Sequence, residues 1–209
     1  MTDRIPVAVL GATGTVGQEL VRRLSAHPWF ELGAVAASAA STGRRLDDAI
    51  RWRSNDLPAG ALALVLRPAT PLAIDAPIVF SALDAGVAEE IEEEFAAAGA
   101  LVVSNARNHR LSDDVPLVIP EVNAGHLALI ERQREMREWQ GAIVTDPNCA
   151  TAVIALALAP LHQAFGLTEF WVTTLQAVSG AGHPGVPALD ILSNVIPWID
   201  GEEEKIARE

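Results

Sequence analysis

The sequence predicts an α/β protein in which a doubly wound parallel sheet is followed by the start of an α+β domain. Strand-like and helix-like apolar runs alternate along the 209 residues, as in a parallel sheet covered by helices. A glycine-rich turn joins the first strand to the first helix. After about residue 148 the alternation of strands and helices stops, because a long strand-like run has no helix directly after it. We therefore expect one domain over residues 1–147 and an incomplete catalytic and dimerisation domain over residues 148–209.

The first predicted elements are a buried strand at residues 7–11, "VAVLG", and an amphipathic helix after the turn. That helix places Val16, Leu20, Val21 and Leu24 on one face, the spacing that a helix packed against a sheet requires. Further strands are expected at residues 31–38, 76–83, 100–105, 142–148 and 169–182.

Helices are expected between these strands. The run "EEIEEEF" at residues 89–95 predicts an acidic, solvated helix face, to which we assign no role. A polar helix is expected near residues 124–139, and an apolar helix begins at Cys149.

Composition and charge exclude several classes of function. With 15 basic and 27 acidic residues the net charge is −12, so the chain lacks the positive surface that a nucleic-acid or anionic-membrane partner requires. The longest apolar run, Ala150 to Leu161, is shorter than the roughly 20 residues that span a bilayer. No signal peptide is evident, and a single cysteine cannot form an internal disulfide. We therefore expect a soluble cytoplasmic protein with a free thiol.

The stretch "GATGTVG" predicts a dinucleotide site of the Rossmann type. It places Gly11, Gly14 and Gly17 after a strand and before a helix. Gly11 permits the sharp turn, Gly14 lets the backbone approach a pyrophosphate, and the helix start offers free N–H groups to the anion. The alternative is a tight strand-to-helix turn that binds nothing.

The end of the second strand favours NADP(H) over NAD. An NAD site usually places an acidic residue there to bind the ribose 2′-hydroxyl, whereas this sequence reads "AASAASTGRR". Ser38, Ser41, Thr42 and Arg44 offer hydrogen bonds and a positive charge to a 2′-phosphate. The alternative is a polar loop with a surface arginine.

Cys149, in "DPNCAT", is a candidate nucleophile. If Asn148 ends a strand and Cys149 opens a helix, the helix dipole favours the thiolate over the thiol. Such a thiolate can attack a carbonyl carbon, and the covalent intermediate that forms can accept a hydride from a nicotinamide bound nearby. The alternative is a small buried apolar residue.

Several motifs together resemble the aspartate-semialdehyde dehydrogenase family, in the branch common in archaea and fungi. They are "VAVLGATGTVGQELV", "VFSAL", "VSNA", "VPLVIPEVN", "DPNCAT", "QAVSGAG" and "GEEEK", in this order over essentially the whole chain. The resemblance implies an oxidoreductase that reduces 4-phospho-aspartate to aspartate 4-semialdehyde with NADPH, on the route to lysine, threonine and methionine. It also implies a homo-oligomer, dimer or tetramer, and a small-molecule substrate.

The resemblance assigns roles to residues of this chain. Cys149 would form a thioacyl enzyme, and Gln176 would position the substrate and the acyl intermediate. Arg110 would bind the departing phosphate, Glu202 the substrate ammonium, and Lys205 phosphate. Cofactor contacts are expected at Gly11, Thr13, Gly14, Thr15, Val16, Ser38, Ser41, Arg44, Ser81, Ala82, Ser179 and Gly180. No metal site is expected.

The chain also departs from the family pattern. Ala150 stands where serine is common, and "SNARNHR" replaces the small residues often found before the phosphate-binding arginine. The family's catalytic histidine belongs to a motif downstream of residue 209, and His183 does not match it. We expect His27, His109, His126 and His162 to be surface or packing residues.

Three alternatives stay open from the sequence. Malonyl-CoA reductase and N-acetyl-glutamyl-phosphate reductase share this layout, and a truncated, non-catalytic nucleotide-binding module belongs to another class. Without the family's histidine, residues 1–209 alone are expected to bind the cofactor without efficient turnover. We also expect them to expose sheet surface that favours association.

Overall fold

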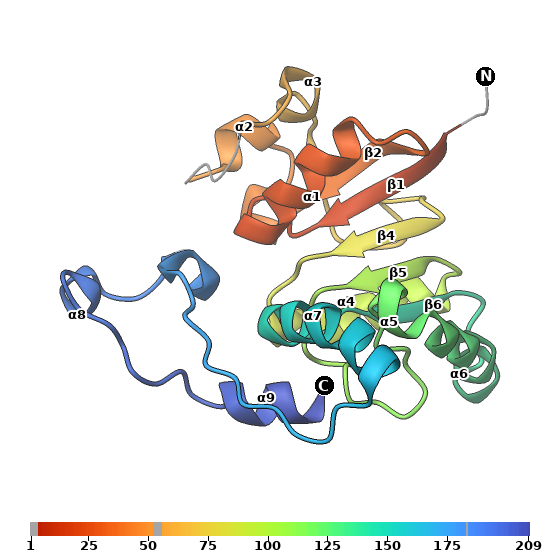
Figure 1. The fold of residues 1–209 in the computed structure, drawn as a ribbon. Coiled ribbons are helices and arrows are strands. Elements are labelled where there is room, and N and C mark those ends of the chain that lie inside the picture. Colours follow the sequence, from red (N-terminus) through yellow and green to blue (C-terminus); the bar gives the residue numbers. More distant parts are fainter. Residues whose placement is uncertain (1–3, 52–55, 183) are drawn as a thin grey trace.

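A computed structural model describes residues 4–51, 56–182 and 184–209. Its centre is a six-stranded sheet in the order β3-β2-β1-β4-β5-β6 (Figure 1). The strands are β1 (Ile5–Leu10), β2 (Phe30–Ala36), β3 (Leu66–Arg67), β4 (Ile78–Ser81), β5 (Leu101–Ser104) and β6 (Ala142–Thr145). Every neighbouring pair is parallel. The order runs outward in both directions from β1, so the predicted doubly wound α/β fold is confirmed.

Helices connect and flank these strands. They are α1 (Thr15–Ser25), α2 (Leu46–Ala49), α3 (Ala59–Leu62), α4 (Ala85–Ala97), α5 (Pro120–Asn123), α6 (Leu129–Arg137), α7 (Cys149–Phe165), α8 (Ala188–Ile191) and α9 (Glu202–Arg208). Short 3-10 helices lie at Ala39–Ser41, Ala124–Ala128 and Val178–Ala181. In the described part of the chain, no helix has the length and apolar character needed to cross a bilayer.

The core consists of two apolar clusters, one on each face of the sheet. Val7 and Val9 of β1 pack in the same cluster as Val21 of α1, while Leu10 belongs to the cluster that contains Phe95 of α4. This alternation follows from the period of two along a strand. Because each fully buried valine, leucine or phenylalanine contributes about 1.5–3 kcal/mol, the two clusters hold the helices on the sheet.

The turn between β1 and α1 requires glycine at two positions. Gly11 has a φ of +75°, and a Cβ there would lie 2.3 Å from the carbonyl oxygen of Ala82. A Cβ at Gly17 would lie 2.0 Å from the carbonyl oxygen of Gly11. Glycine therefore lets the turn pack tightly against the end of β4.

The prediction of a solvated acidic face at residues 89–95 is wrong for one of its acidic residues. Glu92 of α4 is fully buried, together with Ala88, Phe95 and Ala96. These four residues follow the i, i+4, i+7 and i+8 spacing of a helix face that packs on a sheet. The charge run concealed that Glu92 falls on this buried stripe.

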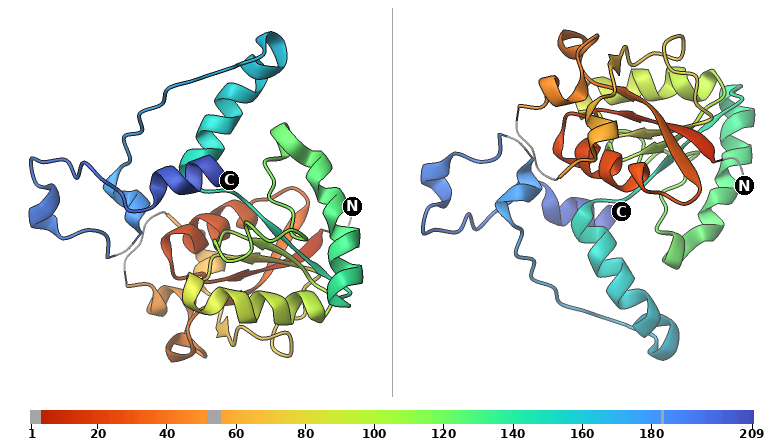
Figure 2. Two further views of the ribbon diagram at one scale, coloured as in Figure 1. Left: turned by 90° about the horizontal axis from the view of Figure 1, so that it is seen from below. Right: turned by 90° about the horizontal axis from the view of Figure 1, so that it is seen from above.

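The predicted strand at residues 169–182 does not form. Residues 166–177 have no regular secondary structure, and Trp171 and Leu175 are almost fully exposed. A strand is stabilised by hydrogen bonds to a neighbour, and no strand of the described residues pairs with this segment. Figure 2 shows the chain after α7 running as an open loop away from the sheet before α9 returns beside α7.

Candidate active site

A pocket of about 620 Å³ lies at the carboxyl ends of the strands, at the point where the strand order reverses between β1 and β4. Ligands of doubly wound sheets bind at this position. Its lining comes from the β1–α1 turn, the segment from β2 to residue 51, the loop after β4, Asn105 after β5, and residues 181 and 182 far along the chain. Most of the predicted cofactor residues line it, namely Thr13, Gly14, Thr15, Val16, Ser38, Ser41, Arg44 and Ala82.

The glycine turn has the features of an anion cradle. Gly14 is the N-cap of α1 and makes no side-chain cap, so the first N–H groups of this helix stay available to an anion. A Cβ at Gly14 would meet only the carbonyl oxygen of Gly11, at 3.4 Å, so glycine here leaves open space in the pocket wall. The buried hydroxyl of Thr15 has no hydrogen-bond partner within the described residues. These features fit a dinucleotide.

The loop after β2 brings together the residues expected to select the cofactor. The hydroxyls of Ser38 and Ser41 lie 3.5 Å apart, and Arg44 lines the same pocket. The Arg44 guanidinium donates a hydrogen bond to the carbonyl oxygen of Asp48. Arg51 also lines the pocket, which the sequence analysis missed because Arg51 lies beyond the loop that carries the serines.

Four expected cofactor residues take other positions in the structure. Gly11 does not line the pocket and packs instead against the backbone of Ala82. Ser81 is fully buried, and its hydroxyl donates a hydrogen bond to Glu92 at 2.6 Å. The Ser81 side chain is therefore directed into the core, so the cofactor contact expected at this residue would have to come from its backbone. Ser179 and Gly180 do not line the described pocket, whereas the next two residues along the chain do.

Cys149 is the first residue of α7, and it is exposed. The interpretation as a small buried core residue is therefore wrong. Asn148 is the N-cap, and its side-chain oxygen accepts hydrogen bonds from the backbone N–H groups of Ala150 at 2.8 Å and Thr151 at 3.5 Å. The sulfur thus sits at the N-terminal end of α7, open to solvent.

Three residues assigned by resemblance meet beside Cys149. The Gln176 side-chain amide lies 3.6 Å from the Cys149 sulfur and 3.5 Å from a carboxylate oxygen of Glu202. Glu202 is buried, and its other oxygen lies 3.6 Å from the Lys205 ammonium and 3.4 Å from the Asn148 amide. A chain of polar contacts thus runs from the thiol through Gln176 and Glu202 to Lys205, residues 27 to 56 positions away in sequence.

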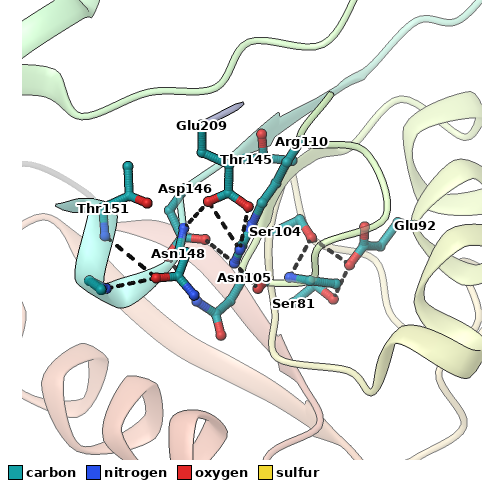
Figure 3. A network of polar contacts seen from close by, with 12 residues as sticks. Ser81, Glu92, Ser104, Asn105, Arg110, Thr145, Asp146, Asn148, Thr151 and Glu209 are labelled. Carbon is teal, nitrogen blue, oxygen red and sulfur yellow. Dashed lines mark hydrogen bonds and ion pairs between the residues drawn. The ribbon is translucent and has the colours of Figure 1, made fainter. Parts of the chain in front are cut away.

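Arg110 lies in an adjoining polar network, drawn in Figure 3. Its guanidinium donates to the carbonyl oxygen of Asn105 at 2.9 Å and pairs with the Glu209 carboxylate at 3.2 Å. The same carboxylate accepts a hydrogen bond from the backbone N–H of Asn148. A cation and a backbone donor thus converge on one anionic group next to the cysteine, as a phosphate site requires.

The network includes residues that the sequence analysis missed. Asn105 follows β5 and donates to Asp146, which follows β6. Burial raises the pKa of Asp146, while the hydrogen bond from Asn105 and the charge of Arg110 oppose this shift. Neither Asn105 nor Asp146 carried a local signal, because the contact between them joins residues 41 positions apart in the sequence.

One histidine of the described residues, His109, lies in the core. His183 lies outside the described residues. His109 is buried, with its Nε2 atom 3.8 Å from a Glu92 oxygen, so it is a packing residue. Within the described part of the chain, no cluster of three histidine, cysteine or acidic side chains could hold a metal ion.

The fold and the site define an α/β dinucleotide-binding protein with an exposed cysteine at a helix N-terminus. Residues 6–130 match the family model "Semialdehyde dehydrogenase, NAD binding domain", and residues 158–209 match "Semialdehyde dehydrogenase, dimerisation domain". The chain belongs to the semialdehyde dehydrogenase family.

Individual relatives agree with this assignment. The chain is 50% identical to aspartate-semialdehyde dehydrogenase of Archaeoglobus fulgidus, over 99% of the chain and 60% of the relative. It is 40% identical to malonyl CoA reductase (NADP) of Metallosphaera sedula, over 100% of the chain and 59% of the relative. The crystal structure of aspartate semialdehyde dehydrogenase with NADP from Candida albicans superposes with a TM-score of 0.84 at 40% identity, over 98% of the chain and 58% of that structure. The chain thus spans about 60% of the length of these relatives.

Proposed function

We propose that the complete enzyme is an NADP-dependent aspartate-semialdehyde dehydrogenase, which converts 4-phospho-L-aspartate and NADPH to L-aspartate 4-semialdehyde, NADP and phosphate. The observation that carries this proposal is the chain of contacts that leads from the exposed sulfur of Cys149 through Gln176 and Glu202 to Lys205. This substrate requires a nucleophile and an amide donor at its acyl group. It also requires a carboxylate for its ammonium group and a cation for its phosphate.

The reaction begins at Cys149. Its thiolate attacks the acyl carbon of the substrate, the C–O bond to phosphate breaks, and a thioester forms. The Gln176 amide lies close enough to the sulfur to donate to the acyl oxygen, where negative charge develops. Arg110 and Lys205 stabilise the departing phosphate, and Glu202 binds the substrate ammonium.

NADPH, when bound, supplies the hydride that reduces the thioester carbon. The β1–α1 turn would hold its pyrophosphate through Thr13, Gly14 and Thr15, and Ser38, Ser41 and Arg44 would hold its 2′-phosphate. The resemblance assigns the proton for collapse of the resulting thiohemiacetal to a histidine in the part of the relatives that this chain does not span.

The organisation of the whole protein is also part of the proposal. We place the domain boundary between residues 147 and 148, because β6 ends at Thr145 and α7 opens with the cysteine. The dimerisation-domain match over residues 158–209 supports a homo-oligomer. An exposed free thiol supports a reducing compartment, the cytoplasm. The proposed pathway is the synthesis of lysine, threonine and methionine.

Assays in the oxidative direction test this function against the malonyl-CoA reductase alternative, which the relative from Metallosphaera sedula suggests. The complete enzyme is given aspartate semialdehyde, NADP and phosphate, or malonate semialdehyde, NADP and coenzyme A. We expect phosphate-dependent NADPH formation, and a loss of at least about a thousandfold in Cys149→Ser. Turnover that requires coenzyme A, or turnover that survives this substitution, would contradict the proposal.

A further inference from the structure

A buried carboxylate lies behind the site, outside the residues that contact substrate or cofactor. Glu92 of α4 is fully buried beneath the carboxyl ends of β4 and β5. One of its oxygens accepts hydrogen bonds from the Ser81 hydroxyl at 2.6 Å and from the Ser104 hydroxyl at 2.7 Å. Ser81 and Ser104 are the last residues of their strands and are register partners in the sheet, so one carboxylate joins both strand ends.

The Ser81 side of this junction leads to the nucleotide pocket. Ala82, the next residue, lines the pocket, and its carbonyl oxygen is the atom that a Cβ at Gly11 would approach to 2.3 Å. The N–H of Ala82 donates to the carbonyl oxygen of Leu10 at the end of β1. A shift of Ser81 would therefore move the wall on which the glycine turn packs.

The Ser104 side leads to the phosphate arginine. The Ser104 hydroxyl also accepts a hydrogen bond from the N–H of Ala106 at 3.1 Å, which fixes the turn after β5. Asn105, within this turn, accepts a hydrogen bond from Arg110 through its carbonyl oxygen and donates to Asp146 through its amide. Figure 3 shows the chain of contacts from Glu92 to Asn148.

Burying this carboxylate has a free-energy cost. Desolvation raises the pKa of Glu92, and the two serine hydroxyls and the charge of His109 only oppose this shift. The second oxygen of Glu92 and the Nε2 atom of His109 have no hydrogen-bond partner among the residues described. An apolar side chain of the same size would avoid this cost, so the carboxylate contributes through the geometry that it imposes.

We propose that Glu92 is a positioning residue, which aligns the nucleotide pocket with Arg110 by holding the hydroxyls of Ser81 and Ser104. The inference rests on the proposed function. It assigns Glu92 no contact with substrate or cofactor.

The test compares variants of the complete enzyme below their unfolding temperatures. Glu92→Gln keeps an oxygen for both hydroxyls, so its KM values and kcat should stay within about twofold of wild type. Glu92→Met keeps the volume but loses the acceptor, so the KM values for NADP and phosphate should rise about tenfold or more. The matched control is Glu94→Met, an exposed position on the same helix, which should leave the KM values unchanged.

Two further variants separate the halves of the junction. Ser81→Ala should raise mainly the KM for NADP, and Ser104→Ala mainly the KM for phosphate. If Glu92→Met does not fold, these two serine variants still test whether the hydrogen bonds to Glu92 position the two sites. A purely structural role would lower the unfolding temperature of all these variants and leave both KM values unchanged, which would overturn the proposal. Equal damage in Glu92→Gln and Glu92→Met would overturn it too.

The outcomes also separate this inference from the proposed function. A wild-type enzyme without phosphate-dependent turnover would refute the function alone. The affinity of Glu92→Met for NADPH, measured by fluorescence, then still tests the nucleotide half of the positioning role: about tenfold weaker binding supports it, and unchanged binding overturns it.

Discussion

At the scale of single residues, the site depends on where side chains are held. Cys149, the proposed nucleophile, opens a helix and is exposed, and Asn148 caps that helix start. The sequence alone predicted the cysteine and its helix, since an N-cap signal is local. It could not place Gln176 and Glu202 beside the sulfur, because those contacts depend on the path of the chain after α7.

Asn148→Ala should destabilise the protein by about 1 kcal/mol, because it removes the acceptor for the first N–H groups of α7. Asn148→Ser is the matched control, since a serine hydroxyl also caps helices, and it should recover most of the loss. Urea denaturation measures both changes. Equal stability of the alanine variant and wild type would show that Asn148 does not cap α7.

Arg44→Ala should weaken NADPH binding by roughly tenfold and leave NADH binding unchanged, because the 2′-phosphate would lose a positive charge. Fluorescence titration of the two nucleotides measures this selectivity. Arg23→Ala removes an exposed arginine on α1 outside the pocket and should change neither affinity. A parallel loss for both nucleotides would place Arg44 away from the 2′-phosphate.

At the scale of elements, the local parts of the fold were predictable and the non-local parts were not. Part of the β1–α1 turn is specified locally, because the positive φ of Gly11 and the approach of Gly17 to the Gly11 carbonyl arise within a few residues. Glu92 was misplaced because a charge run conceals which of its members faces the sheet. The expected strand at residues 169–182 was wrong because its apolar pattern contains no information about a neighbouring strand.

Gly11→Ala should destabilise the protein by about 2 kcal/mol or more, since φ is +75° and the new Cβ would clash with the Ala82 carbonyl. Gly86→Ala, within α4, meets nothing within 4 Å and should stabilise by about 0.5–1 kcal/mol. Thermal unfolding of both variants measures the contrast. A neutral Gly11→Ala would mean that the turn relaxes easily.

Glu92 should make stability depend on pH. Burial raises its pKa above the ordinary value of 4.5, so the folded state binds the proton more tightly than the unfolded state does. The contribution of this proton to stability is complete below pH 4.5 and is lost as pH rises through the folded-state pKa. His109 is the titratable group that faces it, and Ser81 and Ser104 supply its hydrogen bonds.

Glu92→Gln removes this titration. The free energy of unfolding of the variant, relative to wild type, should therefore increase as pH rises from 5 to 8. Urea denaturation across this range measures the difference. Parallel curves for the two proteins would contradict the raised pKa.

At the scale of the whole molecule, the described residues divide into a well-packed sheet and an open apolar segment. Val153 and Phe165 of α7, and Trp171, Leu175 and Trp198 beyond it, are mostly exposed. Figures 1 and 2 show this part of the chain extending away from the sheet. Exposed apolar side chains of this kind favour contact with other protein surface, in agreement with the dimerisation-domain match.

A polypeptide of residues 1–209 alone should therefore bind NADPH but associate in solution. Sedimentation velocity and binding of a hydrophobic dye should reveal the association, whereas residues 1–147 should remain monomeric and bind little dye. A monomeric, dye-free polypeptide of 209 residues would show that the apolar segment folds onto the sheet by itself.

The most direct measurement of the central claim is mass spectrometry of the complete enzyme after reaction with aspartate semialdehyde and NADP in the absence of phosphate. We expect one equivalent of NADPH and an aspartyl thioester on the peptide that contains Cys149. Hydride transfer from the thiohemiacetal to NADP forms this thioester, and without phosphate the acyl group stays on the sulfur. The ester should vanish on addition of phosphate. An acyl group on another residue, or an unmodified Cys149 despite NADPH formation, would contradict the account.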